Sequence, residues 1–535
     1  MAFAKKTAKA TSLAKNYKII ERQRVQIMKR FKIMASLLLA TTIMISTGCA
    51  GGSANNTPEG TPPDYSNSTL QFEFYGYSGP SNGNYNEYGV SYNTGEDFRT
   101  VERFREYKDS GMTLNFPQTF AAYSGITSWE ESEAKHFIGV AAEAGLERTI
   151  LTDWRIARIS KVEGGLIGEG KKYSTEADLD AYIEDCLNDY IDDVNIYGVM
   201  LGDEPVYNAL KSYGEVYKSI KRVAKKFRDE DFFIHANLIG CFNSTNATKW
   251  YGELPEDFDT TGMAKIDIIY AQYANYVETY FEETGADYVQ YDSYPLNEGS
   301  IGETHVVAMK LVANICKKLN KDFWFINQTM NMLTSEGEQR YMTEADARWV
   351  NNLSIGFGAE AIGYFTYWRK ADNDAREYFN DYASFISQYG EKTNLYYSMQ
   401  KIMAEEQKLA PTILNFRYNA SAIYTMKPTQ TLTNYCSGFV NDDFTALSEV
   451  EINKEAALVT ELYDKNKGNY MYMVQNMVDP LNQGSSVYQT STLKFDEKYK
   501  SAVVIYRGES KLVALKNSLV SFKLNPGDAV FVIPY

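Results

Sequence analysis

Short apolar or aromatic runs alternate with longer amphipathic segments from residue 70 to about residue 410. A short apolar run bounded by turn residues is typical of a buried strand, whereas apolar positions that recur every three to four residues are typical of a helix. Eight strands are predicted in this way, at residues 70–77, 113–119, 148–154, 195–204, 232–240, 287–294, 322–329 and 361–368.

Amphipathic helices are predicted between these strands, for example at residues 96–111, 130–145 and 210–228. Gly111, Gly145 and Gly285 stand where a helix should end just before the next strand. Strict alternation of strands and helices predicts a parallel sheet, because two parallel neighbours need a crossover connection. The predicted fold class is therefore α/β, and eight such units predict a (β/α)8 TIM barrel over residues 70–410. An open doubly wound sheet is the alternative, but no glycine-rich phosphate loop follows the first predicted strand.

After residue 410 the helical periodicity disappears and short strands follow one another to the end of the chain. The sequence Asn-Pro-Gly-Asp at 525–528 is typical of a turn between two of them. Residues 411–535 are therefore predicted to form a small antiparallel β-sandwich that serves as an accessory domain.

The N-terminal part has the layout of an export signal. A basic region, Lys29 to Lys32, is followed by an apolar run at 33–45 and then by small residues. The run is shorter than the roughly 20 residues that a transmembrane helix needs. Residues 1–48 are therefore predicted to be a signal region, with Met28 as its expected true start.

The end of this region resembles a bacterial lipobox, in which the signal is cut before a cysteine that carries lipid. Cys49 takes the place of that cysteine, while Ser46 stands where the lipobox usually has Leu or another aliphatic residue. The resemblance implies an extracytoplasmic protein that is anchored to a bacterial membrane through Cys49, and residues 49–69 then form a flexible linker. A plain secretory signal is the alternative.

Composition narrows the classes of partner. The chain has 535 residues, of which 44% are hydrophobic and 23% charged, so it supports a large core and is not a minimal binding module. Lys and Arg number 54 against 69 Asp and Glu, a net charge of −15 without a dense basic stripe, which argues against nucleic-acid binding. Three His and the absence of a closely spaced Cys pair argue against a structural zinc site, and we expect no metal and no cofactor.

The carboxyl ends of the predicted strands hold the candidate chemistry, because barrels of this kind carry their active sites there. The fourth strand ends in Asp203 and Glu204, and the sixth in Asp292 and Tyr294. Carboxylates transfer protons and bind hydroxyls, while aromatic rings stack on sugar rings, so this mixture favours a carbohydrate substrate. Further candidate substrate-binding residues at strand ends are Asp153, Trp154, Asn327, Gln328, Tyr367, Trp368 and Arg369.

Over residues 70–410 the chain resembles the clan A glycoside hydrolases, in which the acid/base Glu ends strand four, after Asn and before Pro. Glu204 has that position before Pro205, with Asp203 in place of the Asn. Tyr367 and Trp368 also look like the sugar platform of that clan. The resemblance implies that Glu204 is the acid/base of a glycosidase.

One position departs from the clan, whose nucleophile is a Glu at the end of strand seven. This chain has Asn327 and Gln328 there, and a neutral amide cannot attack an anomeric carbon or deprotonate water. Asp292 is the preferred second carboxylate, and its shorter side chain favours inversion or an altered geometry. The other route is similar to that of substrate-assisted hexosaminidases, with Asp203 holding a substrate acetamido group while Glu204 protonates the leaving oxygen.

Structural roles compete with these assignments at several positions. Asp203 is also suited to be a helix N-cap, Asp153 to pair with Arg155, and Trp368 to cover the core. His235 and Asn237 share one face of the fifth strand and are expected inside the barrel. Three hypotheses therefore remain: an exported glycosidase, a carbohydrate-binding protein that has lost its strand-seven nucleophile, and the solute-binding lipoprotein of a transporter.

Overall fold

The computed structural model describes residues 45–46, 58–81, 84–87, 90–93, 96–116, 122–331, 333–334, 337–368, 384–387, 389–426, 436, 438–481 and 488–535. Cys49, Arg369 and all of the predicted signal except Ile45 and Ser46 lie outside the described residues.

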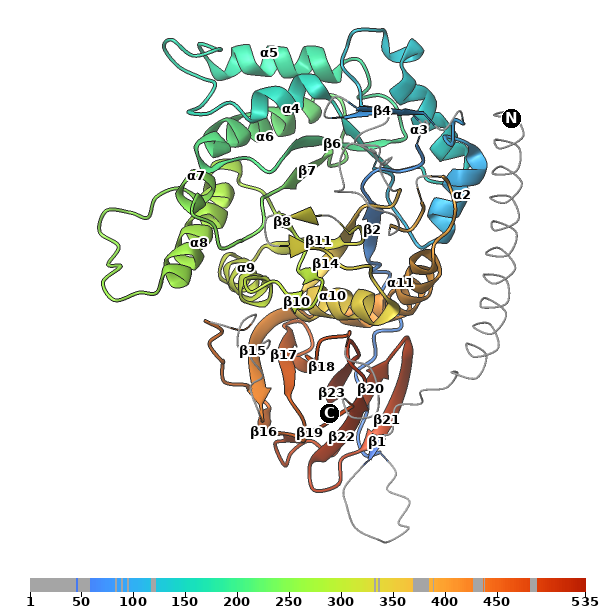
Figure 1. The fold of residues 1–535 in the computed structure, drawn as a ribbon, viewed down its shortest axis with the longest axis vertical. Helices are drawn as coiled ribbons and strands as arrows, with labels where there is room; N and C mark the ends of the chain where they lie inside the picture. Colours follow the sequence, from blue (N-terminus) through green and yellow to red (C-terminus); the bar gives the residue numbers. More distant parts are fainter. Residues whose placement is uncertain are drawn as a thin grey trace, which may run out of the picture. The chain divides into compact units, whose positions relative to one another are not determined.

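Parallel strands form the first part of the fold, and seven of the eight predicted strands are confirmed (Figure 1). Four of them form one parallel sheet in the order β2-β14-β11-β8, and three form another in the order β5-β6-β7. Their bounds are β2 (Glu73–Gly76), β5 (Thr149–Thr152), β6 (Ile196–Asp203), β7 (Phe233–Asn237), β8 (Tyr288–Ser293), β11 (Asp322–Gln328) and β14 (Ala359–Phe365).

Isolated parallel bridges join the two sheets. The predicted second strand is reduced to two bridging residues, and residues 117–119 of it lie outside the described chain. Neighbours thus follow one another in chain order, and the last strand, β14, lies beside the first, β2. The bridges pair Tyr75 with Leu114, Asn115 with Thr149, and Leu238 with Tyr291.

Amphipathic helices cover these strands, and the helices expected at 96–111, 130–145 and 210–228 are confirmed as α2, α3 and α6. Gly285 ends α8 in the left-handed conformation, as its position predicts. In the part of the chain that the structure describes, no helix is both long and apolar enough to cross a bilayer. The helices are α2 (Val101–Asp109), α3 (Glu133–Glu143), α4 (Trp154–Ser160), α5 (Glu176–Leu187), α6 (Leu210–Ala224), α7 (Ala247–Tyr251), α8 (Lys265–Thr284), α9 (His305–Leu319), α10 (Glu344–Gly356) and α11 (Asn394–Ile413), with 3-10 turns η1 (Trp129–Glu131) and η2 (Tyr207–Ala209).

Three short antiparallel pairs lie in the loops between these elements. They are β3 (Asn84–Glu87) with β4 (Val90–Asn93), β9 (Leu296–Asn297) with β10 (Ser300–Ile301), and β12 (Leu333–Thr334) with β13 (Gly337–Glu338).

The C-terminal region is antiparallel, as the change of pattern after residue 410 predicts. One sheet has the order β15-β17-β18-β23-β20-β21 and the other the order β1-β22-β19-β16. The strands are β1 (Ile45–Ser46), β15 (Arg417–Thr425), β16 (Leu447–Ile452), β17 (Ala456–Asp464), β18 (Asn469–Asn476), β19 (Gln489–Phe495), β20 (Ser501–Tyr506), β21 (Glu509–Ala514), β22 (Leu519–Leu524) and β23 (Ala529–Pro534).

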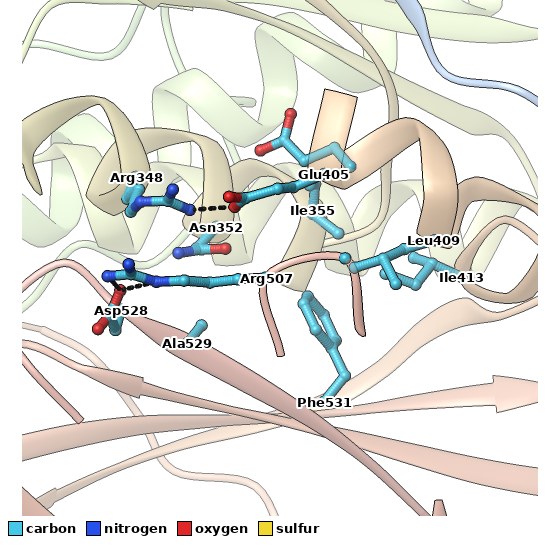
Figure 2. A pocket seen from close by; sticks show the side chains of 12 residues that line it. Arg348, Asn352, Ile355, Glu405, Leu409, Ile413, Arg507, Asp528, Ala529 and Phe531 are labelled. Atoms are coloured by element: carbon cyan, nitrogen blue, oxygen red, sulfur yellow. Dashed lines mark hydrogen bonds and ion pairs between the residues drawn. The ribbon is translucent and has the colours of Figure 1, made fainter. Parts of the chain in front are cut away.

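Helix α10 joins the two parts, because it contacts β11 and β14 on the parallel side and β17 and β18 on the antiparallel side. A cavity of about 30 Å³ lies at this junction between α10, α11 and the C-terminal strands (Figure 2). Its charged walls are internally paired: Arg348 binds Glu405 at 2.7 Å, and Arg507 binds Asp528 at 2.7 Å. The junction is therefore polar, and the cavity has room for about one or two water molecules.

Candidate active site

Glu204 follows directly on β6 in a strained backbone conformation. Its φ of 48° lies in the left-handed region, which costs a residue other than glycine on the order of 1–3 kcal/mol and is often found at functional sites. The pairing of β6 with β7 shifts register between Met200 and Gly202, and a β-bulge of this kind re-aims the residues that follow it. A hydrogen bond of 2.9 Å from the Glu204 backbone N–H to the Asn237 carbonyl holds the turn in place.

Three carboxyl groups from two strand ends meet at this point. The amide of Asn237 donates to Oδ1 of Asp203 at 2.9 Å and to Oδ1 of Asp292 at 3.2 Å. A side-chain hydrogen bond joins Glu204 to Asp292, and another joins Tyr294 to Asp292. The structure therefore brings together four of the residues that the sequence singles out, and we call Asp203, Glu204 and Asp292 the carboxyl cluster.

The cluster holds its protons unequally. Burial, followed by the charges of Asp292 and Asp203, raises the pKa of Glu204 to about 9. Burial and the charge of Asp203 raise the pKa of Asp292 to about 6, and hydrogen bonds from Tyr294 and Asn237 oppose that rise. At neutral pH Glu204 is therefore the protonated acid and Asp292 the ionised carboxylate.

A chain of uncharged side chains lies behind Asn237. Nε2 of Gln290 is 3.4 Å from Oδ1 of Asn237 and 3.0 Å from Nε2 of His235, and the hydroxyl of Tyr75 donates to Oε1 of Gln290. Burial lowers the pKa of His235 to about 3, so the imidazole stays neutral. His235 is thus an interior hydrogen-bonding group, which is the structural role expected for it.

An aromatic wall stands beside the cluster. Tyr77 is 2% exposed, and its ring centroid lies 4.4 Å from that of Phe116 and 6.2 Å from that of Phe365. Phe365 in turn stacks on Tyr294 at 5.4 Å. Among the described residues, the buried hydroxyl of Tyr77 has no hydrogen-bond partner, which leaves it free to serve a ligand.

Asp153 and Trp154 make other contacts. Asp153 is fully buried, caps α4, pairs with Arg155 at 2.8 Å and accepts from the hydroxyl of Tyr190 at 3.1 Å. Trp154 is the first residue of α4 and is 40% exposed. Asp153 thus makes the structural pairing with Arg155 that was the alternative to substrate binding.

The two amides at the end of β11 point to different neighbours. Asn327 donates to Oδ1 of Asn351 in α10 at 2.9 Å, so it faces the helix layer. The side-chain amide of Gln328 accepts from the backbone N–H of Leu296 at 2.9 Å and donates to its carbonyl at 3.0 Å. Leu296 lies two residues after Tyr294, and Gln328 therefore stabilises the loop that carries Tyr294, the partner of Asp292.

Tyr367 and Trp368 are core residues in this structure, 0% and 1% exposed. The ring of Tyr367 lies 4.5 Å from that of Tyr107, and the ring of Trp368 lies 4.9 Å from that of Phe98. Their predicted role as a sugar platform stays a prediction, and both lie where they cover the core.

Three residues of the site escaped the sequence analysis as candidates: Asn237, Gln290 and Tyr77. Side chains two apart on a strand share a face. Gln290 is two residues from Asp292, and Tyr77 two from the interior Tyr75. The two-residue alternation along a strand, counted from the candidate and interior residues, is the signal that could have identified them.

Comparisons with known proteins find similarity to solved structures only. No family model matches this chain, and no curated protein matches it. Its similar solved structures include a glycoside hydrolase of family 5 from Bacteroides vulgatus (12% identity, TM-score 0.46, 87% of this chain and 88% of that one). An α-amylase from Anoxybacillus (10%, 0.43, 87% and 97%) and an endo-β-1,4-mannanase from Thermotoga petrophila (13%, 0.38, 86% and 99%) are also similar.

Proposed function

We propose that this protein is a glycoside hydrolase in which Glu204 is the general acid and Asp292 the partner carboxylate. The parallel strands then close into a (β/α)8 barrel of the clan A type, followed by a β-sandwich as the accessory domain. The observation that carries the proposal is the contact between half-buried Glu204, at the end of β6, and buried Asp292, in β8, two carboxyl groups with split proton affinities.

Glycoside hydrolysis needs this division of labour. A protonated carboxyl group donates its proton to the glycosidic oxygen while the bond from that oxygen to the anomeric carbon breaks. A second, ionised carboxylate either attacks the anomeric carbon or takes a proton from the attacking water. Glu204 meets the first requirement and Asp292 the second.

The close approach of Glu204 and Asp292 favours retention of configuration. Inverting enzymes keep their carboxyl groups about 6.5–9.5 Å apart to admit a water, whereas retaining enzymes keep them about 5–5.5 Å apart. Asp292 is therefore the nucleophile in this proposal, and the inversion that its short side chain favoured becomes the alternative. The first-formed product anomer, followed by NMR, distinguishes the two routes.

Leaving-group chemistry tests the role of Glu204. A panel of aryl glycosides with phenols of increasing basicity is assayed with the wild type and with the Glu204→Gln and Asp292→Asn variants. A missing proton donor costs most when the leaving oxygen is most basic, so the loss caused by Glu204→Gln should grow along the series. The loss caused by Asp292→Asn should be large throughout.

Asp287→Asn is the matched control, because Asp287 lies just before β8, at the opposite end of the strand from Asp292, and pairs with Lys321 at 3.2 Å. Equal losses in all three variants, or a Glu204→Gln loss that does not depend on the leaving group, would remove Glu204 from the mechanism.

A carbohydrate-binding protein without hydrolytic activity is the second candidate. Asn327 and Gln328 favour it, since they replace the carboxylate at the end of strand seven with amides. It requires saturable sugar binding in calorimetry without any release of reducing ends during long incubation.

The N-terminal sequence supports an exported and membrane-anchored form with lipid on Cys49. Labelled fatty acid should enter the wild type and be absent from a Cys49→Ser variant in a bacterial host. Equal labelling of both proteins would reject the anchor.

A further inference from the structure

Asn237 lies at the centre of the carboxyl cluster and uses its amide on two acids at once. Its Nδ2 donates one hydrogen to Asp203 of β6 at 2.9 Å and the other to Asp292 of β8 at 3.2 Å. The residue is 3% exposed, so water does not compete for these hydrogens. Both donors are therefore committed to carboxylate oxygens, which are stronger acceptors than neutral groups.

The orientation of this amide is fixed from behind. Its Oδ1 can only accept, and Nε2 of Gln290 donates to it at 3.4 Å. The hydroxyl of Tyr75 occupies Oε1 of Gln290, which leaves Nε2 as the donor toward Asn237 and His235. Because Gln290, Tyr75 and His235 are all uncharged, they align the amide of Asn237 without adding a positive charge to the cluster.

We infer that Asn237 is a positioning residue that decides which carboxyl group of the cluster holds the proton. Its amide stabilises the ionised form of Asp292 and binds Asp203, whereas its contact with Glu204 is through the backbone carbonyl. The negative charges of Asp292 and Asp203 in turn keep the proton on Glu204, the group that needs it for acid catalysis. The inference deepens the proposed function, on which its catalytic meaning rests, but the distribution of the proton is measurable without any substrate.

Other charged or titratable groups face the cluster from each neighbouring element. Lys161, after α4, lowers the pKa of Glu204, while Tyr294 donates to Asp292. Three uncharged groups also face the cluster: Tyr77, which follows β2, Tyr276 of α8 and His235 of β7. They are uncharged because burial raises the pKa of both tyrosines and lowers that of the imidazole.

Removing the two donors has a defined sign. Without the hydrogen bond from Asn237, Asp292 takes up a proton more readily, so its pKa rises. A less negative neighbourhood then lets Glu204 lose its proton more readily, so its pKa falls. The loss of one hydrogen bond to a charged group corresponds to about one to two pH units at Asp292.

Infrared titration of the whole protein tests the inference. The carbonyl band of a protonated carboxylic acid is followed against pH, and Glu204→Gln and Asp292→Asn assign its components. Asn237→Leu, which keeps the size and removes both donors, should move the two midpoints toward each other by about one to two pH units at Asp292. Asn237→Ser, a smaller change that keeps one hydroxyl donor, should move them less and serves if the Leu variant does not fold.

Asn327→Leu is the matched control, since Asn327 is an equally buried strand asparagine that binds Asn351 and Ser354 instead of carboxylates. Its Glu204 and Asp292 midpoints should equal those of the wild type, and Glu406→Gln assigns the separate component of Glu406, which Asn327 reaches through Asn351. Unchanged midpoints in both Asn237 variants would overturn the inference, and so would an equal shift in the Asn327 variant. A shift confined to Asn237 in a protein that cleaves no glycoside would uphold the inference and reject the proposed function.

Discussion

Asn237 and Asn351 are buried amides that each donate to carboxyl groups, but the groups that surround the two amides differ. Asn237 bridges two carboxylates of a cluster that contains a third, whereas Asn351 donates to both oxygens of the single carboxyl group of Glu406, at 3.1 and 3.2 Å. Burial raises the pKa of Glu406 to about 8, nearly as far as that of Glu204.

The difference lies in the neighbouring charges. At Glu406 the hydrogen bond from Asn351 and the charge of Arg348 oppose the rise and the charge of Glu405 adds to it, whereas at Glu204 the two largest charge effects, those of Asp292 and Asp203, both add to it. A buried acid with a raised pKa is therefore not by itself evidence of an active site. What distinguishes the carboxyl cluster is that Glu204 contacts a second carboxyl group, Asp292, which holds the negative charge while Glu204 holds the proton.

The largest expected effect separates the two acids by activity. Glu204→Gln should lower kcat/KM by about 10²- to 10⁴-fold, the usual cost of losing a general acid. Glu406→Gln should leave kcat/KM near that of the wild type, because Gln reproduces the shape of the protonated acid. Steady-state kinetics on one aryl glycoside measures both. A comparable loss in the two variants would mean that the cluster has no special role.

The next effect concerns stability and belongs to Glu406. Its pKa is about 4.5 in the unfolded chain and about 8 in the folded protein, so folding binds a proton between these values. The stability of the wild type should therefore fall relative to Glu406→Gln as pH rises from 4.5 to 8, by on the order of a few kcal/mol, and then level off. Urea unfolding at pH 4.5, 6.5 and 8.5 measures it.

Glu256→Gln, an exposed substitution, supplies the control for the stability series. A constant difference between the wild type and Glu406→Gln at all three pH values would contradict the assignment of a buried, protonated Glu406.

A third effect is the pH profile of kcat/KM. Asp292 has to be ionised and Glu204 protonated, so activity should be maximal between about pH 6 and about pH 9 and fall about tenfold per unit outside. The Glu204→Gln variant should lose the alkaline limb, and Glu406→Gln should keep both limbs. Glu204 and Asp292 titrate as a coupled pair, so both limbs belong to the pair. A wild-type profile with a single limb would contradict their roles as acid and carboxylate.

The smallest effect compares two buried tyrosines. Tyr77 and Tyr291 are both buried, and neither hydroxyl has a partner among the described residues. The charge of Asp292 acts on both, but that of Asp203 acts on Tyr77, whereas the ring of Tyr291 packs against Phe323 and Phe325. If Tyr77 donates to bound substrate, Tyr77→Phe should lower kcat/KM about tenfold, the value of one such hydrogen bond. Tyr291→Phe should change it little, and equal effects would assign both hydroxyls to the core.

Local pattern was sufficient for seven of the eight predicted parallel strands, for the helices at 96–111, 130–145 and 210–228, and for the position of the cluster. Glu204 and Asp292 end strands that period and turn residues define, and strand ends of parallel sheets meet at one edge. The pattern could not fix which of Asn327 and Gln328 faces inward, because neighbours on a strand point in opposite directions and the choice depends on register. The contact of Trp368 with Phe98 was beyond reach for another reason, since it joins segments 270 positions apart.

Helix α10 has a consequence for any attempt to divide the chain. Gln475 of β18 donates to the carbonyl of Trp349 at 2.9 Å, and Asn352 donates to the carbonyl of Gly527 at 2.9 Å. A protein cut after residue 413 would present these backbone and amide groups, and the surrounding Trp349 face, to water. The C-terminal strands therefore act as the second wall of this helix, and calorimetry should find both halves melting in one event.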